Sequence, residues 1–420
     1  MRPPPDRLPL ITLAALFVGY ACSYFHRADL AALAPLWATD GVHGELRAAF
    51  ADIASLGMFV YACGKVLGGL LAERFGGRRV FVGALAGAGG AEFVAMQLDA
   101  PLPFACCRAA GMLVLGCAWP ALGHVVAAVT PRVRLATVMA FVSQSYLVGD
   151  AAVRALLAAV VARGGGAHAV LGTATTGLLV AAAVVGLSLW RGRARGIAAA
   201  PMPTPAAATG TVVPPATNPA LARLLLALAA MNFGLATVRE ALSLWTPTLL
   251  HELCGLAADD AVRASALLPL ASGVGALVAG PLADRGSRAL LLVTLLPCLA
   301  GAATLASLAG LVMGGEVTFA SMLFAVAFAS ACLAMPMTLA SGVLPLRAAA
   351  TGGARRLGFV DGAGSLGAVL AGGALARVQA GVGAGGMFGV LGGVALVAAA
   401  MALVVHRVSA VRTPAAPPAP

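Results

Sequence analysis

Three basic side chains lie inside long apolar stretches of the sequence, where charges are rare. Arg27, Lys65 and Arg239 each have many apolar residues on both sides. A charged side chain at the centre of a bilayer costs about 2.5–3.5 kcal/mol even on the most lenient scale, so such residues usually face a polar cavity. A guanidinium group binds phosphate or carboxylate oxygens through two parallel hydrogen bonds. The three residues therefore predict an anion site within the membrane.

Phenol groups accompany these cations at helical spacing. Tyr20 and Tyr24 precede Arg27 in the sequence and share one helix face with it. Tyr61 precedes Lys65 by one turn. Lys65 is the only lysine among the 420 residues, and a buried lysine, unlike arginine, can lose its proton. We expect these tyrosines to line the anion site.

Ion pairs inside the protein are the alternative to contact with a ligand. The acids that could neutralise the three cations are Asp29, Asp52 and Glu240. Arg154 follows Asp150 by four residues, so these two are predicted to pair along one helix. Tyr146 lies one turn before Asp150 and is expected to extend that polar face into the cavity.

A few other polar residues in the apolar stretches have less defined roles. Arg108 begins an Arg-x-x-Gly stretch, for which a role in structure or proton coupling and a role in substrate contact are equally open. His26 is assigned to packing, because it lies on a different helix face from Arg27. Glu92 and Asp361 are acids within apolar stretches, and nothing in the sequence assigns them a role.

The elements that carry these residues are predicted to be membrane-spanning helices. A helical span needs about 20 apolar residues. The apolar stretches lack the alternation of barrel strands, and only helices or closed barrels satisfy the backbone within lipid. The twelve expected spans are 8–37, 47–73, 79–98, 101–129, 134–162, 167–190, 220–251, 260–283, 289–313, 317–346, 350–376 and 383–406.

The distribution of positive charge indicates membrane topology rather than nucleic-acid binding. The net charge is +11, with 26 arginines and one lysine. Eighteen of these lie at the termini or in the even-numbered connections, and four lie on the opposite side. Such a bias places the basic side in the cytoplasm. We expect a multi-pass protein of the cell (inner) membrane with both termini cytoplasmic and no nucleic-acid partner.

The sequence divides into two halves that repeat each other. Residues 191–219 begin with three arginines and continue rich in Pro, Ala and Thr, which predicts a cytoplasmic linker. Residues 1–190 and 220–408 then form two pseudo-symmetric six-helix bundles, and residues 409–420 form a flexible tail. Such duplication is common in secondary transporters, whose substrate binds between the repeats.

Two turn motifs illustrate the repeat. Glu73-Arg74 and Asp284-Arg285 both follow Gly-x-x-Ala at an offset of 211 residues, and Arg27 and Arg239 are offset by 212. An acid and arginines at a helix end can pair in one conformation and separate in the other. The motifs are therefore expected to act as gates; in the alternative interpretation their arginines only fix topology.

Together these segments resemble the major facilitator superfamily and, within it, the organophosphate:phosphate antiporters, the group with the glycerol-3-phosphate and hexose-phosphate transporters. The motifs that carry the resemblance are the two Gly-x-x-Ala-Glu/Asp-Arg turns, Gly19-Tyr20-Ala-Cys-Ser-Tyr24-Phe-His-Arg27, Tyr61-Ala-Cys-Gly-Lys65-Val-Leu-Gly68, Val238-Arg239 and Leu244-Trp245-Thr246-Pro247-Thr248-Leu249. The resemblance implies that Arg27 and Arg239 clamp a phosphate and that Lys65 assists them. Tyr20 takes the place of the family's aromatic partner in the first helix.

The chain departs from that family at positions that contact the organic part of the substrate. Tyr146 stands where the glycerol-3-phosphate type has a histidine. Leu244 stands where that type has an acid, although Glu240 lies one turn earlier. The resemblance therefore predicts the phosphate end of a substrate and leaves its organic part open.

These observations predict a carrier that exchanges an organophosphate for inorganic phosphate by alternating access, and that works as a monomer. One alternative is a proton-coupled carrier of a carboxylate or phosphonate, with Asp150, Glu240 or Lys65 as the proton carrier. Another is a transporter-like sensor of a sugar phosphate. An enzyme, a cofactor and a metal site are not expected, because no nucleophile–base pair, metal-ligand cluster or phosphate-cradling loop emerges. The eight scattered cysteines are predicted to be unpaired thiols, mostly buried.

Overall fold

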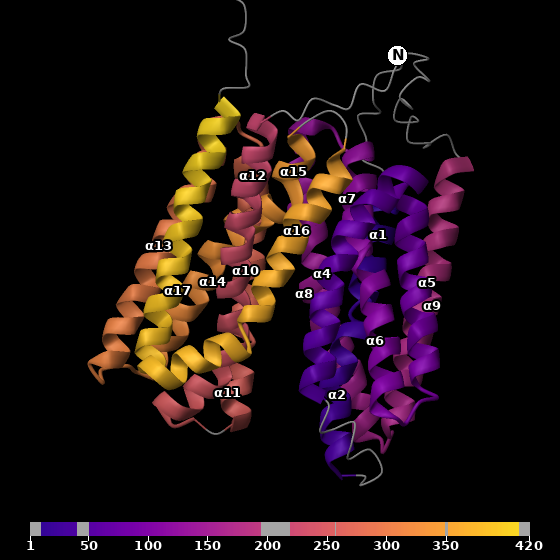
Figure 1. Ribbon diagram of the computed structural model, residues 1–420, viewed down its shortest axis with the longest axis horizontal. Helices are drawn as coiled ribbons and strands as arrows, with labels where there is room; N and C mark the ends of the chain where they lie inside the picture. The colour runs from indigo at the N-terminus through magenta and orange to yellow at the C-terminus, as the bar shows by residue number, and fades with distance from the viewer. Residues whose placement is uncertain (1–9, 40–49, 195–218, 257, 349–351, 411–420) are drawn as a thin grey trace, which may run out of the picture.

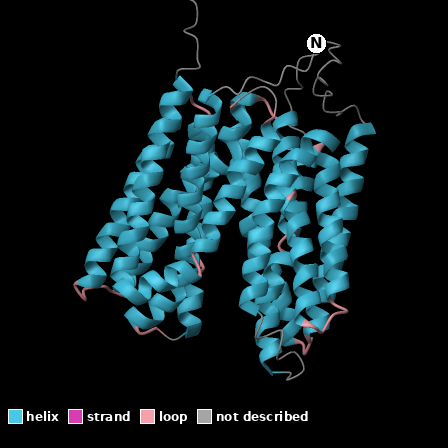
Figure 2. Ribbon diagram, viewed as in Figure 1, coloured by secondary structure: helices cyan, strands magenta, loops and turns pink. Residues whose placement is uncertain are grey.

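The computed structural model describes residues 10–39, 50–194, 219–256, 258–348 and 352–410. Within these ranges every regular element is a helix and no strand occurs (Figure 2). The prediction of an all-helical fold is therefore confirmed. The helices of the first half are α1 (Leu10–Cys22), α2 (Phe25–Thr39), α4 (Phe50–Phe75), α5 (Gly77–Ala95), α6 (Pro101–Gly116), α7 (Ala118–Val129), η1 (Arg132–Arg134), α8 (Leu135–Ala162) and α9 (Ala167–Ala194).

The second half is also built of helices, and two irregularities occur in it. The π-helical segment η2 interrupts one span, and α17 contains a kink at Gly383. The helices of this half are α10 (Pro219–Cys254), α11 (Ala258–Ser265), α12 (Leu267–Ala283), α13 (Ser287–Met313), α14 (Phe319–Thr338), η2 (Leu339–Val343), α15 (Leu344–Arg347), α16 (Gly353–Leu370) and α17 (Gly373–Ala410).

Nine helical segments within the described ranges are long and apolar enough to cross a bilayer. Each of them largely overlaps one predicted span, and the predicted spans without such a segment are 8–37, 79–98 and 350–376. The first of these three is broken into α1 and α2 by a turn at Ser23 and Tyr24. The other two coincide with α5 and α16, which carry several charged residues. The fold is thus that of a helical membrane protein, while the count of twelve spans stays a prediction.

The helices lie in two groups, with α1 to α9 in one and α10 to α17 in the other (Figure 1). Helices α4 and α8 of the first group pack against α16 and α12 of the second. The groups adjoin at the end where α9 ends and α10 begins, here called the linker end, and diverge toward the end that holds α11 (Figure 1). Helix α9 runs four residues beyond the predicted boundary at 190, and most of the predicted linker lies outside the described residues. The domain boundaries therefore stay a prediction.

Glycines bring the backbones of the two groups into direct contact. A Cβ atom at Gly69 of α4 would lie 2.5 Å from the carbonyl oxygen of Ala354, and one at Gly358 of α16 would lie 2.3 Å from that of Lys65. Side chains larger than hydrogen do not fit at such distances, as is common where membrane helices pack closely. The contact of α4 with α16 therefore depends on these two glycines.

The substitution Gly358→Ala should lower the melting temperature of the purified protein. The added methyl group would meet the Lys65 carbonyl oxygen and push α16 away from α4, and overpacking of this kind typically costs about 1–3 kcal/mol. The matched control is Gly90→Ala in α5, because nothing lies within 4 Å of its added methyl group. An unchanged melting temperature for Gly358→Ala would contradict the close contact.

Candidate functional site

A polar cavity of about 80 Å³ lies between the two groups of helices. Its walls come from α1, α2, α4, α7 and α8 on one side and from α10, α14, η2 and α16 on the other. All seven residues that the sequence analysis assigned to substrate binding line this cavity. They are Tyr20, Tyr24, Arg27, Tyr61, Lys65, Tyr146 and Arg239.

Arg27 is held by aromatic rings at the break in the first span. The turn between α1 and α2 begins at Ser23, whose hydroxyl donates to the carbonyl oxygen of Tyr20 at 2.6 Å. The Arg27 guanidinium donates to the Tyr24 hydroxyl at 2.8 Å and lies 4.6 Å and 5.1 Å from the ring centroids of Tyr24 and Tyr61. Cation–π contact of this kind stabilises a partly desolvated guanidinium. No carboxylate among the described residues pairs with Arg27, so its remaining donors are available to a ligand.

Lys65 forms an ion pair that joins the two groups. Its Nζ atom lies 2.6 Å from Oδ2 of Asp361 on α16, and both side chains are about 10 % exposed. The contact lacks hydrogen-bond geometry at this oxygen, and Nζ also lies 4.9 Å from the Tyr61 ring centroid. Asp361 itself lines the cavity. Sequence reasoning left this acid without a role, and the structure places it beside the predicted lysine.

Arg239 pairs with its neighbour in the sequence, Glu240. The sequence analysis had named this acid as a possible partner of the cations. Its guanidinium lies 5.6 Å from the ring centroid of Tyr146. Glu240 also lines the cavity. Asn232 lies seven residues before Arg239 on α10. Its side chain donates to the carbonyl oxygen of Val360 at 3.0 Å and so links α10 to α16.

The cavity carries less positive charge than the sequence suggested. Three basic and two acidic side chains line it, which leaves a net charge of +1. Glu240 and Asp361 neutralise Arg239 and Lys65, so two of the three cations form ion pairs inside the protein. The unbalanced cation is Arg27.

The acid of each repeated turn motif reaches across to the other group at the linker end. Glu73 accepts hydrogen bonds from the backbone N–H of Arg355 at 3.0 Å and from its guanidinium at 2.7 Å. Asp284 accepts from the backbone N–H groups of Ala136 and Thr137 at 3.2 Å and 2.9 Å, and it pairs with Arg347. Each acid thus binds the first turn of a helix in the opposite group, where the backbone dipole attracts negative charge.

The arginines of these two motifs do not take part in that contact. Arg74 is exposed and lies 5.4 Å from the ring centroid of Phe75. Arg285 is exposed and forms no ion pair with another described residue. In this conformation the partners of the motif acids are Arg355 and Arg347, and the gating role of the motifs stays a prediction.

The remaining predicted pair forms on the surface of α8. Nε of Arg154 lies 2.7 Å from Oδ1 of Asp150, and the side chains are 54 % and 37 % exposed. Neither residue lines the cavity. The side chain of Asp52 lies outside the described part of the structure.

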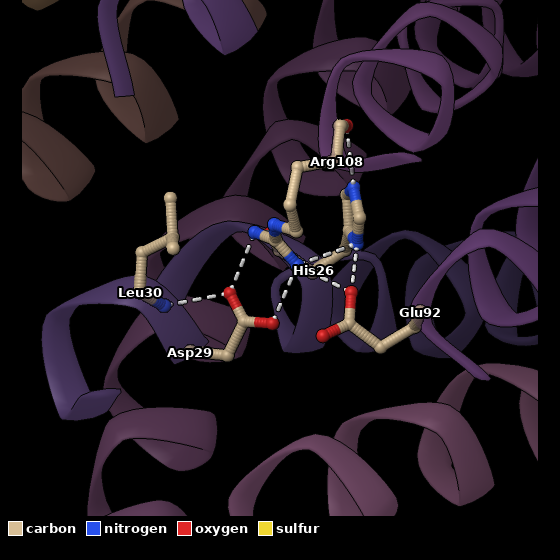
Figure 3. A network of polar contacts seen from close by, with 5 residues as sticks. All are labelled: His26, Asp29, Leu30, Glu92 and Arg108. Atoms are coloured by element: carbon tan, nitrogen blue, oxygen red, sulfur yellow. Dashed lines mark hydrogen bonds and ion pairs between the residues drawn. The ribbon is translucent and has the colours of Figure 1, made fainter. Parts of the chain in front are cut away.

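A second polar cluster joins side chains of α2, α5 and α6 in the first group of helices (Figure 3), and none of them lines the cavity. Arg108 donates to both carboxylate oxygens of Asp29, at 2.7 Å and 2.8 Å, and it also contacts Glu92. His26 contacts Glu92 and Arg108 through its ring. Asp29, one of the three acids considered as partners of the site cations, pairs with Arg108 instead. His26 was assigned to packing and instead belongs to this polar cluster.

The side chains of this cluster include the types that bind metal ions, a histidine and two carboxylates. Donor atoms of His26, Asp29 and Glu92 lie within 4.8 Å of one another. The Arg108 guanidinium contacts all three side chains. The positive charge between the two carboxylates is therefore supplied by arginine.

Comparison with known families decides the class of this protein. The family model described as Major Facilitator Superfamily matches residues 16–354. The chain belongs to the major facilitator superfamily. It is therefore a transporter and not an enzyme, as the sequence analysis predicted. A comparison with curated proteins finds no match.

Solved structures of this superfamily share the fold of the transporter. The proton:xylose symporter XylE superimposes with a TM-score of 0.70 at 14% identity, over 93% of this chain and 94% of that one. The human organic anion transporter MFSD10 gives 0.71 at 15% identity, over 95% and 100%. The E. coli fucose:proton symporter FucP gives 0.62 at 16% identity, over 97% and 98%. At such identities the likeness concerns the fold alone.

The Lys65–Asp361 pair should show strong energetic coupling in a double-mutant cycle. Removing one partner leaves a nearly buried charge unpaired, which typically costs about 3–5 kcal/mol, whereas removing both leaves no such charge. We expect the double variant Lys65→Ala/Asp361→Ala to have a higher melting temperature than the summed losses of the two single variants predict. The exposed pair Asp150–Arg154 is the control, with a coupling of at most about 0.5 kcal/mol. Strictly additive effects at Lys65 and Asp361 would exclude the ion pair.

The substitution Glu73→Gln should favour separation of the two groups at the linker end. It removes the charge that binds Arg355 and the first turn of α16. A loss of about 1 kcal/mol corresponds to roughly a fivefold shift in the conformational ratio. Spin-label distances between α4 and α16 measure that ratio. Arg74→Gln is the control, and an equal effect of both substitutions would argue against the cross-group contact.

Proposed function

We propose that this transporter exchanges a small organic phosphate for inorganic phosphate by alternating access. The main support is the position of Arg27, a cation without a carboxylate partner among the described residues, on the wall of a cavity shared by both groups. Arg239 and Lys65 line the same cavity and offer further donors to a phosphoryl group. Guanidinium groups suit this chemistry, because they bind phosphate oxygens through paired hydrogen bonds.

Ligand binding in this proposal rearranges the ion pairs of the cavity. A phosphate that engages Lys65 competes with Asp361, and one that engages Arg239 competes with Glu240. The Lys65–Asp361 pair spans the two groups, so its loss weakens their contact. Binding of the anion can then shift the two groups toward separation, provided that the separated conformation binds the anion more tightly than the closed one.

The same pair makes opening at the linker end depend on a bound anion. In the empty transporter Lys65 and Asp361 hold α4 against α16. A bound anion frees Asp361, the groups rock apart at the linker end, and the anion leaves. Without a bound anion the pair re-forms and holds the transporter closed at the linker end, so opening of that end requires a loaded site. With the basic side in the cytoplasm, the conformation described here is the one closed toward the cytoplasm.

A second candidate function is a proton-coupled carrier of a small organic acid. The observation that favours it is the presence of Glu240 and Asp361 in the cavity. With both ionised, the net charge of +1 matches a monoanion such as a carboxylate. A proton on either acid would free Arg239 or Lys65 for the ligand and couple the two fluxes.

Counterflow in proteoliposomes tests the proposal and separates it from its rivals. Vesicles loaded with phosphate should take up labelled phosphate, and the substitution Arg27→Lys should reduce the rate at least about tenfold, because an ammonium group loses the paired hydrogen bonds. Arg154→Lys, outside the cavity, is the matched control and should keep the parental rate.

Each rival predicts another result. Uptake driven by a pH gradient without internal phosphate would favour the proton-coupled carrier. Ligand binding without any flux would favour a sensor. Full phosphate exchange by Arg27→Ala would remove Arg27 from the site.

A further inference from the structure

Hydrogen-bond acceptors line the cavity where α10 packs against α16. Asn232 of α10 and Asp361 and Ser365 of α16 form this part of the lining, here called the acceptor wall. Gly364 and Ala368 share the same face of α16 and add no polar side chain. A carboxylate can only accept hydrogen bonds, and the Ser365 hydroxyl already donates to the carbonyl oxygen of Asp361 at 3.3 Å. The acceptor wall therefore suits a ligand that brings its own donors.

The side-chain oxygen of Asn232 is an acceptor that the described part of the protein leaves unused. Nδ2 donates to the carbonyl oxygen of Val360 at 3.0 Å, and this fixes the orientation of the amide, because the reverse orientation would bring two acceptors together. Oδ1 is buried and has no hydrogen-bond partner among the described residues. The residue is 0 % exposed, yet it lines the cavity. A buried acceptor without a donor costs free energy, which a ligand with a donor would recover.

The carboxylate of Asp361 depends on Lys65 for its compensation. Oδ2 lies 2.6 Å from Nζ of Lys65, and the Asp361 side chain is about 10 % exposed. Within the described ranges no hydrogen bond of good geometry reaches this oxygen. Val360, whose carbonyl oxygen accepts from Asn232, directly precedes Asp361 in α16. The carboxylate therefore lies next to the point where Asn232 contacts α16.

Binding of a phosphate leaves this carboxylate without its partner. In the function proposed above, on which this inference rests, the phosphate takes Lys65 from Asp361. A nearly buried charge that loses its partner is strongly destabilising. A ligand with only a phosphate group therefore gains an ion pair with Lys65 at the expense of the pair between Lys65 and Asp361. A ligand that carries its own cation restores the lost pair.

Glu240, the other acid of the cavity, has less need of such a cation. Its side chain is 32 % exposed, against about 10 % for Asp361. Water therefore screens the charge of Glu240 more effectively when its partner Arg239 turns to a ligand. The position that most requires a cation from the ligand is Asp361.

The net charge of the cavity fits the same class of ligand. The side chains that line it sum to +1. Near neutral pH a phosphate monoester carries a charge of about −1.5 to −2, and an aliphatic ammonium group adds one positive charge. The total for an aminoalkyl phosphate is close to −1, which neutralises the cavity. A phosphate ester without a cation leaves the cavity with an excess of negative charge.

We propose that the organic phosphate of this transporter is a short aminoalkyl phosphate or phosphonate. Its phosphoryl group binds Arg27 and Lys65, whose cationic groups lie 5.1 Å and 4.9 Å from the centroid of the same Tyr61 ring. Its ammonium group binds Asp361 and donates to Oδ1 of Asn232. One ion pair of the closed protein is thus replaced by two. The cavity of about 80 Å³ leaves room for only a short chain between the two ends of the ligand.

Three ligands with the same number of heavy atoms test the need for the ammonium group. The chains of 2-aminoethyl phosphate, 2-hydroxyethyl phosphate and propyl phosphate end in an ammonium, a hydroxyl and a methyl group. Each is titrated against the purified full-length protein, and the rise in melting temperature gives its dissociation constant. The ammonium compound should bind at least about tenfold more tightly than the other two, as a charge-assisted hydrogen bond to a nearly buried carboxylate implies. Equal or tighter binding of either other ligand would overturn the proposal.

The substitution Asp361→Asn tests which side chain binds the ammonium group. It keeps the shape of the side chain and removes its charge, so the preference for 2-aminoethyl phosphate over propyl phosphate should fall to about twofold or less. The preference compares two ligands on one variant, so a general loss of stability does not alter it. Asp150→Asn, outside the cavity, is the matched control and should keep the parental preference.

Two outcomes of this comparison would contradict the assignment. A full preference in Asp361→Asn, or its loss in Glu240→Gln alone, would place the ammonium group elsewhere. If Asp361→Asn does not fold, the three ligands still decide the need for a cation on the parental protein.

Counterflow separates a failure of this inference from a failure of phosphate exchange. Vesicles loaded with phosphate should take up labelled 2-aminoethyl phosphate. Phosphate exchange without any preference for the ammonium compound would overturn the inference and leave the proposed function standing. Preferential binding of that compound without phosphate exchange would support the inference and overturn the exchange. Binding of none of the three ligands would overturn both.

Discussion

Every charge inside this protein needs a compensating partner within reach, because lipid and apolar side chains cannot solvate an ion. The structure meets this constraint with a small set of pairs. They are Lys65 with Asp361, Arg239 with Glu240, and Arg108 with Asp29. Arg27 contacts two phenol rings and one of their hydroxyls, which carry no compensating charge. The unbalanced charge of the protein interior thus lies on the wall of the cavity, where an anion can compensate it.

The packing of the two groups and the electrostatics of the cavity are parts of one arrangement. Gly358 lets α16 approach the backbone of α4 at Lys65, and Asp361 lies one turn farther along α16. The lysine reaches the carboxylate only because the two backbones are that close. Separation of α4 from α16 therefore breaks the ion pair, and loss of the ion pair weakens the contact of the helices.

The sequence was sufficient to predict the three cations and the four tyrosines of the cavity wall but not how their charges are balanced. Arg27 and Lys65 could be identified because a charge within an apolar stretch demands a polar environment. Asp361 could not be assigned, because it lies far from Lys65 in the chain and only the packing of α16 on α4 brings them together. His26 looked like a packing residue; the available signal was its position three residues before Asp29, on the same helix face. The break before Arg27 has no glycine or proline to mark it.

The net charge of the cavity also determines how the transporter responds to a membrane voltage. A site with charge +1 that changes sides during turnover moves through part of the transmembrane field, where each elementary charge is worth about 2.3 kcal/mol per 100 mV. A bound dianion reverses the sign of the moving charge, and a bound monoanion cancels it. The voltage therefore pulls the empty and the dianion-loaded forms in opposite directions and leaves the monoanion-loaded form indifferent. The carboxylates of Glu240 and Asp361, by setting the charge of the empty site, decide whether a transport cycle generates current.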